Sequence, residues 1–267
     1  MKKYLSFFRL RFVTGLQYRA AAASGIATQF IWGFLEILVF HAFYEADPSA
    51  FPMSLKAAAA YVWLQQSFLA LFATWQMDPE ILDAIQTGVV AYELCRPIRI
   101  YDLWFTKNTA IRISKAVLRC FPILLVAALL PSSYGLCRPA GWMHGLLFLL
   151  SLTLGLLVTV SLCTLIQVLS LLTLSPNGLQ IIFSSATEFL SGAILPLPFL
   201  PQRLRALMEL LPFASMQNVP FRIYSGSMTA MEMTRAILLQ AVWLLILVLG
   251  GQLLCRRVVK KIIIQGG

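Results

Sequence analysis

Six long apolar stretches constrain this chain more than any other feature of its sequence. A helix rises about 1.5 Å per residue, so about 20 apolar residues cross the roughly 30 Å hydrocarbon core of a membrane. Backbone in lipid must satisfy its own hydrogen bonds, and a helix does so within one segment. We therefore predict an all-α integral membrane protein with six transmembrane helices. The predicted spans are residues 20–43, 57–75, 111–130, 143–172, 179–194 and 236–255.

The composition supports a membrane protein and excludes an ordinary soluble domain. Hydrophobic residues make up 59% of the 267 residues and charged residues 12%, whereas about a quarter of a soluble domain is charged. The net charge of +10 does not indicate a nucleic-acid partner, because the basic residues lie at the ends of the apolar stretches. The five cysteines are scattered, so we expect neither a metal site nor a disulfide framework.

The distribution of basic residues predicts how the six spans are oriented. Lys and Arg gather before the first span, between the second and third spans, and after the sixth. The positive-inside rule places these segments, and therefore both termini, in the cytosol. The start of the third span is the least certain boundary, because it contains Arg112, Lys115 and Arg119. Its apolar part begins near Cys120 unless these side chains snorkel to the membrane interface.

The segment between the second and third spans, residues 78–99, is predicted to be a cytosolic amphipathic helix. Asp78 is its expected N-cap and Pro79 its first helical residue. Glu80 and Asp83 place negative charge near the positive end of the helix dipole. The apolar face carries residues at helical spacing, namely Ile81, Leu82, Ile85 and Val89.

Two residues limit this amphipathic helix. Gly88 weakens it midway, and Pro97 forces the preceding residue out of the helical region, so we expect the helix to end by Arg96. An amphipathic helix held between two spans on the basic side of the membrane is a candidate contact for a partner outside the membrane.

Two further segments are predicted to lie at the membrane surfaces. Residues 1–19 place apolar side chains on one helical stripe beside several arginines, which favours a helix in the membrane interface. Their charges interrupt any short apolar core, so we expect no removable signal peptide. Residues 195–235 are apolar but broken by prolines, and we predict an external re-entrant segment with a short amphipathic helix at 203–211.

The sequence carries none of the common nucleotide-binding or metalloprotease motifs. It lacks GxxxxGK[ST], GxGxxG and HExxH, so we expect no hydrolysis of nucleotide by a P-loop, no catalytic residue and no metal ligand. Neither His41 nor His144 has an acidic or nucleophilic partner in the sequence, and we interpret both as interfacial side chains.

Polar side chains inside the apolar stretches are candidates for a substrate path. A carboxylate at the membrane centre costs on the order of 3 kcal/mol, so such a group usually faces a cavity or a partner. An interhelical hydrogen bond, for instance between Glu188 and Gln167, would explain these residues equally well. The candidates for the path are Glu36, Gln65, Gln66, Gln167 and Glu188.

The order of these elements resembles the permease subunits of type-2 ABC exporters, the ABC-2 family. Residues 85–99, IQTGVVAYELCRPIR, are similar to the family's cytosolic stretch that ends in Leu, one residue and Arg-Pro. Residues 191–213, SGAILPLPFLPQRLRALMELLPF, are similar to its external signature around the fifth span. The resemblance covers essentially the whole chain and points to the single-domain, six-span bacterial subgroup.

The resemblance implies that the helix at 78–99 docks in a cleft of a separate ABC ATPase, with the N-terminal helix beside it. It implies a bacterial cytoplasmic membrane, a second permease that is identical or a sister subunit, surrounding lipid, and amphipathic substrates. ATP and Mg²⁺ would be bound by the partner ATPase, and this chain would hold no cofactor. The implied coupling residues are Asp78, Glu80, Asp83, Gln86, Gly88, Glu93, Arg96, Pro97 and Arg99.

Two other classes of function stay open at the level of the sequence. A stand-alone secondary transporter or channel would need no partner, but such proteins typically show inverted repeats, which we do not find. An integral membrane enzyme would need a cluster of His, Asp, Glu or Ser at facing positions, and the sequence does not indicate one.

Overall fold

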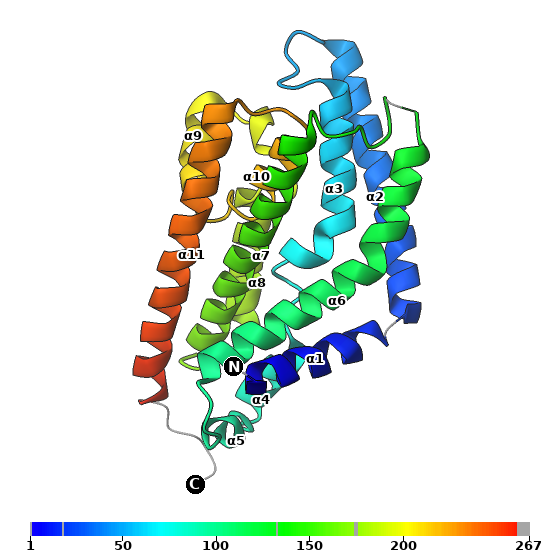
Figure 1. Ribbon diagram of the computed structural model, residues 1–267. Coiled ribbons are helices and arrows are strands. Elements are labelled where there is room, and N and C mark those ends of the chain that lie inside the picture. Colours follow the sequence, from blue (N-terminus) through cyan, green and yellow to red (C-terminus); the bar gives the residue numbers. More distant parts are fainter. Residues whose placement is uncertain (1, 18, 132, 174–175, 261–267) are drawn as a thin grey trace.

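The protein is described by a computed structural model that covers residues 2–17, 19–131, 133–173 and 176–260. Within these ranges the chain is helical and has no β-strand (Figure 1). Ser175, in the predicted turn, and Lys261, in the basic tail, lie outside the described residues. The elements are α1 (Lys2–Leu16), α2 (Arg19–Ala46), α3 (Leu55–Phe72), α4 (Pro79–Gln86), α5 (Val90–Leu94), α6 (Ile100–Leu129), α7 (Trp142–Ser170), α8 (Pro176–Leu190), η1 (Leu197–Phe199), α9 (Gln202–Leu210), α10 (Asn218–Tyr224) and α11 (Ala230–Val259).

The helices α2, α3, α6, α7, α8 and α11 overlap the six apolar stretches, and the all-α integral membrane class is confirmed. By length and composition, three helices in the described ranges are able to cross a membrane: Ala22–Ala46, Trp142–Ser170 and Ala230–Val259. Helix α8 has only 15 residues, which span about 22 Å, less than a bilayer core. The six-span arrangement therefore stays a prediction.

Helix α6 begins at Ile100, well before the predicted third span at 111–130. The charged part of α6 includes Arg112, whose side chain is only 1% exposed. Its Nη1 atom donates to the carbonyl oxygens of Leu71 at 3.0 Å and Ala73 at 2.9 Å. These carbonyls belong to the C-terminal end of α3, where acceptors are unsatisfied and the helix dipole is negative. Arg112 is therefore buried within the protein rather than snorkelling to the interface.

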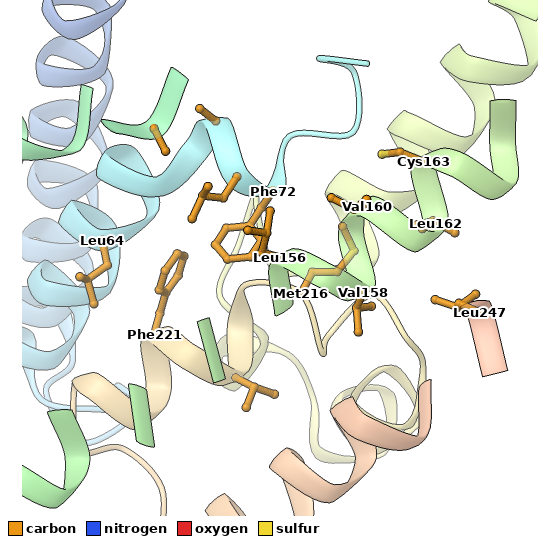
Figure 2. Close-up of a cluster of buried hydrophobic side chains, with 14 of the residues drawn as sticks. Leu64, Phe72, Leu156, Val158, Val160, Leu162, Cys163, Met216, Phe221 and Leu247 are labelled. Carbon is orange, nitrogen blue, oxygen red and sulfur yellow. The ribbon is translucent and has the colours of Figure 1, made fainter. Parts of the chain in front are cut away.

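Helix α7 forms the centre of the hydrophobic core (Figure 2). Leu156, Val158, Val160, Leu162 and Cys163 of this helix are all buried. Side chains from α3, α10 and α11 complete the same cluster, including Leu64, Phe72, Phe221 and Leu247. The Phe221 ring packs edge-to-face against Tyr61, with centroids 5.4 Å apart, and Phe72, at 5.7 Å. The core therefore joins elements that are far apart in the sequence.

The predicted re-entrant segment, 195–235, contains the expected amphipathic helix as α9 and also a helix that the sequence did not indicate. This second helix, α10, is buried between α3 and α7. The side-chain amide of Gln240 on α11 fixes the residues that precede α10. Its Nε2 atom donates to the carbonyl of Ser215 at 2.8 Å and to that of Ser151 on α7 at 3.1 Å. The segment thus enters the core instead of lying only on a surface.

Two glycines of α7 allow a test of this close packing. A methyl group added at Gly155 would lie 2.1 Å from the carbonyl oxygen of Met216, whereas nothing lies within 4 Å of the same position at Gly145. Gly155→Ala should lower stability by about 1–3 kcal/mol through overpacking. Gly145→Ala should raise it by about 0.5–1 kcal/mol through helix propensity. Thermal unfolding of the purified variants in detergent measures both, and equal effects would contradict the packing described.

Candidate functional site

The segment predicted as one amphipathic helix forms two short helices, α4 and α5, joined at Gly88. The predicted start is confirmed: Asp78 is the N-cap, its side chain accepts from the Glu80 backbone N–H at 3.1 Å, and Pro79 is the first helical residue. Gly88 has a φ of 75°, a left-handed conformation that favours glycine. The chain therefore turns at Gly88, and α4 and α5 present separate surfaces.

Helix α1 is attached to the start of α4 by a charge cluster. The Nη2 atom of Arg11 contacts both carboxylate oxygens of Asp78, at 2.6 and 2.7 Å, and Nη1 contacts Glu80. The Asp78 side chain is 0% exposed and that of Arg11 is 13% exposed. Burial alone would lower the pKa of Arg11, but the charges and hydrogen bonds of the two carboxylates raise it above its ordinary value. The guanidinium stays charged and holds α4 against α1.

Helix α1 also contacts the segment that follows α5. The Lys3 ammonium donates to the carbonyl oxygen of Pro97 at 2.6 Å. Along its length α1 packs on α6 (Figure 1), and at Gly15 the two helices approach so closely that a methyl group would collide with Ser114. Both ends of the α4–α5 segment are therefore held by the same N-terminal helix.

Helix α5 is attached to α6 through Glu93. This carboxylate accepts from the Lys107 ammonium at 2.6 Å and from the Trp104 indole N–H at 2.7 Å. A few residues away, Arg99 pairs with Asp102 at 2.9 Å, and the amide of Gln252 on α11 donates to Asp102 at 3.2 Å. Displacing α5 would therefore pull on α6 and α11 as well.

The predicted coupling residues divide into an internal group and an exposed group. Asp78 and Glu93 face the protein, and Gly88 forms the turn. Glu80 is largely exposed but paired with Arg11, and Pro97 and Arg99 lie at the exposed end of the segment. The outward surface, which we call the α4–α5 tip, consists of Asp83, Gln86, Thr87, Val89, Tyr92 and Arg96.

Sequence reasoning missed the apolar part of this tip. Tyr92 is 73% exposed and Val89 is 48% exposed. Val89 was assigned to the apolar face of a single amphipathic helix, but the turn at Gly88 changes the helical register and Val89 is exposed. The presence of Gly88 in the middle of an amphipathic pattern was the signal that could have indicated this. These two apolar side chains therefore lie on an outward surface whose other members are polar.

Four of the predicted path residues form hydrogen bonds between separate segments of the protein. The Gln66 amide donates to Glu36 at 3.4 Å, joining α3 to α2, and the Gln65 amide donates to the carbonyl of Ala193 at 2.6 Å. Gln167 is fully buried and accepts from Asn108 at 2.7 Å. The suggested pairing of Gln167 with Glu188 was therefore wrong, because Gln167 bonds to α6 instead.

The fifth predicted path residue, Glu188, lies on an open groove along α8. The groove has a volume of about 540 Å³. Its polar members recur at three- and four-residue intervals, which places them on one helix face. Ser184 is buried there, and its hydroxyl has no hydrogen-bond partner among the described residues. The groove is lined by Trp75, Asn177, Gln180, Ile181, Ser184, Ser185 and Glu188.

In the part of the chain that the structure describes, no three His, Cys, Asp or Glu side chains are placed to hold a metal ion. His41 stacks on Tyr134 with ring centroids 5.1 Å apart and hydrogen bonds to its hydroxyl at 3.1 Å. It also lies 3.3 Å from Glu45. These contacts give His41 a packing role near the end of α2.

Comparison with known proteins supplies a family. The profile of the ABC-2 family transporter proteins matches residues 30–266. This range includes α3 to α11, and with them the α4–α5 tip and the groove along α8. No curated protein sequence matches the chain.

The charge cluster on α1 can be tested with a matched pair of arginines. Arg11→Gln leaves the buried Asp78 without its partner and should lower the free energy of opening α4 by about 3 kcal/mol. Hydrogen exchange of the α4 amides should then accelerate about a hundredfold. Arg9 is exposed and forms no ion pair with the described residues, so Arg9→Gln is the control. Equal exchange in the two variants would contradict the role given to Arg11.

Proposed function

The chain belongs to the ABC-2 family of transporter proteins, and we propose that it is the permease subunit of an exporter. Membership implies partnership with ABC ATPase subunits. In our proposal ATP and Mg²⁺ bind on those partners, and this chain performs no hydrolysis and holds no cofactor. The end of the bundle that carries α4 and α5 would face the cytosol of a bacterial cell, since the basic segments lie there.

The observation that carries this proposal is the way the α4–α5 tip is fastened. The tip is exposed to a partner, while the carboxylates behind it are engaged with α1 and α6. A partner that pushes on the tip would therefore move α1 through Arg11 and α6 through Lys107. The tip combines apolar Val89 and Tyr92 with charged neighbours, a mixture suited to a groove on a soluble protein.

The groove along α8 supports a second permease. A face that carries Asn177, Gln180, Ser185 and Glu188 is costly to expose to hydrocarbon. The cost disappears if the groove faces another permease and a water-filled path between the two. We therefore propose a pair of permeases, identical or sister subunits, with Glu188 on the substrate path. An amphipathic substrate fits such a path, because polar and apolar side chains both line it.

The role of the tip predicts a charge-reversal phenotype. Asp83→Lys should weaken association with the ABC ATPase about tenfold, because reversing an exposed interface charge disturbs electrostatic complementarity. Glu45→Lys is the control, since Glu45 is also exposed but belongs to the last turn of α2, and that end of α2 lies at the opposite end of the bundle from α4 (Figure 1). Co-purification and stimulation of ATPase activity are the measurements.

Two results would overturn the coupling assignment. One is unchanged association and stimulation in Asp83→Lys. The other is transport by the purified chain alone, driven by an ion gradient, which would establish a stand-alone secondary transporter or channel.

The proposed substrate path predicts that two nearby positions on α8 differ in their access to water. Ser185 lines the groove, whereas Ile182 is exposed but does not. With Cys95, Cys120 and Cys137 replaced by Ser, cysteines at these two positions can be labelled in vesicles by a charged maleimide. A thiol must ionise to react, which lipid prevents. Ser185→Cys should react at least about tenfold faster than Ile182→Cys. Equal rates would contradict a water-filled path along α8.

A further inference from the structure

A second cavity is lined by the C-terminal end of α11, the start of α6 and the end of α5. These three helix ends lie at the same end of the bundle (Figure 1). It has a volume of about 370 Å³. It is separate from both the α4–α5 tip and the groove along α8, and the proposed export function does not use it. Its lining residues are Leu94, Ile98, Arg99, Ile100, Tyr101, Asp102, Gln252, Cys255, Arg256, Val259 and Lys260.

The charge around this cavity is positive. Its one carboxylate, Asp102, already pairs with Arg99 at 2.9 Å and accepts from Gln252 at 3.2 Å. Arg256 and Lys260 are exposed and form no ion pair within the described residues. They are four residues apart on α11, so they lie on the same face of that helix. Two uncompensated cations therefore border the opening.

The walls behind these cations are apolar. Leu94, Ile98 and Val259 are partly buried and belong to the same hydrophobic cluster as Ile100 and Cys255. A small soluble anion would gain nothing from such walls. A phospholipid would gain from both parts, since its phosphate can contact the cations and its chains can cover the apolar side chains.

The cavity lies at the point along α11 where a lipid headgroup is expected. The helix is long and apolar enough to cross a membrane, and after Arg235 near its start the next basic residues are Arg256 and Arg257 in its last turn. Cations at this place lie at the boundary between hydrocarbon and water. In the orientation proposed above, this boundary is that of the cytosolic leaflet, where basic cavities between membrane helices recognise anionic lipids.

We propose that this cavity binds an anionic phospholipid of the cytosolic leaflet, such as phosphatidylglycerol. The phosphate lies between Arg256, Lys260 and Arg99, and an acyl chain leaves along Leu94 and Val259. The bound lipid joins α11 to the end of α5, which is part of the segment that the ATPase contacts in the proposed function. Lipid binding itself does not require that partner, so the two proposals can fail separately.

The test uses the purified full-length chain and two variants of α11. Arg256→Gln combined with Lys260→Gln removes the two unpaired cations. Arg257→Gln is the matched control, because Arg257 is exposed on the same turn but does not line the cavity. Each protein is titrated with phosphatidylglycerol, with phosphatidylcholine and with inorganic phosphate, and retained adducts are counted by native mass spectrometry.

The expected result is a retained phosphatidylglycerol adduct in the wild type and in Arg257→Gln. Each lost charge should weaken binding about fivefold, so the double variant should bind about 25-fold less. Equal retention of phosphatidylcholine, or equal loss in Arg257→Gln, would overturn the proposal in favour of general attraction to a basic surface. Displacement of the lipid by inorganic phosphate at similar concentration would assign the site to a free anion instead.

If the double variant fails to fold, Val259→Trp tests the apolar wall by filling it. This variant keeps all three cations and should lower phosphatidylglycerol retention while leaving weak phosphate binding unchanged. Unchanged lipid retention in Val259→Trp would overturn the assignment of the acyl chain to the cavity.

Discussion

The ion pair between Arg11 and Asp78 is the interaction on which the proposed coupling region depends. Asp78 is a fully buried N-cap, and a buried charge is tolerated only when it is paired and hydrogen-bonded. Arg11 supplies the pair, and the Glu80 backbone N–H supplies the hydrogen bond. Because separating α1 from α4 would leave the buried carboxylate of Asp78 without its cation, the separation costs free energy. The position of α1 across α6 therefore determines where the α4–α5 tip lies.

The basic residues in the first half of α6 are also compensated inside the protein, in two different ways. Lys107 is neutralised by the carboxylate of Glu93, which brings α5 to α6. Arg112 contacts no carboxylate within the described residues and instead takes carbonyl oxygens at the end of α3, together with the sulfur of Cys163. A helix C-terminus carries partial negative charge, so it can satisfy a buried guanidinium. These contacts explain how α6 stays helical through a stretch that is too charged to be an ordinary membrane span.

Local chemistry could be predicted from the sequence, whereas long-range burial could not. Capping by Asp78, the weakness at Gly88 and the apolar stretches follow from residue type and spacing, and the structure shows helices at those places. The burial of α10 depends on Gln240 and Phe221 meeting α7, which no local pattern reveals. The exposure of Val89 depends on the angle at Gly88. The burial of Arg112 could not be predicted either, because the carbonyl oxygens that accept its hydrogen bonds lie about 40 residues away in the chain.

The same contacts determine how a push on the tip could reach the proposed path. Helix α4 is joined to α8 by the hydrogen bond from Gln86 to Asn177, at 3.0 Å. The Gln180 amide, one turn further along α8, donates to the carbonyl of Trp75, which lies in the connection between α3 and α4. Asn177, Gln180 and Trp75 also line the groove that contains Glu188. A displacement of α4 therefore acts directly on one end of that groove, without passing through the tightly packed α7. Rigid side-chain links of this kind, rather than a deformable core, are what allow a movement at one surface to change access at another.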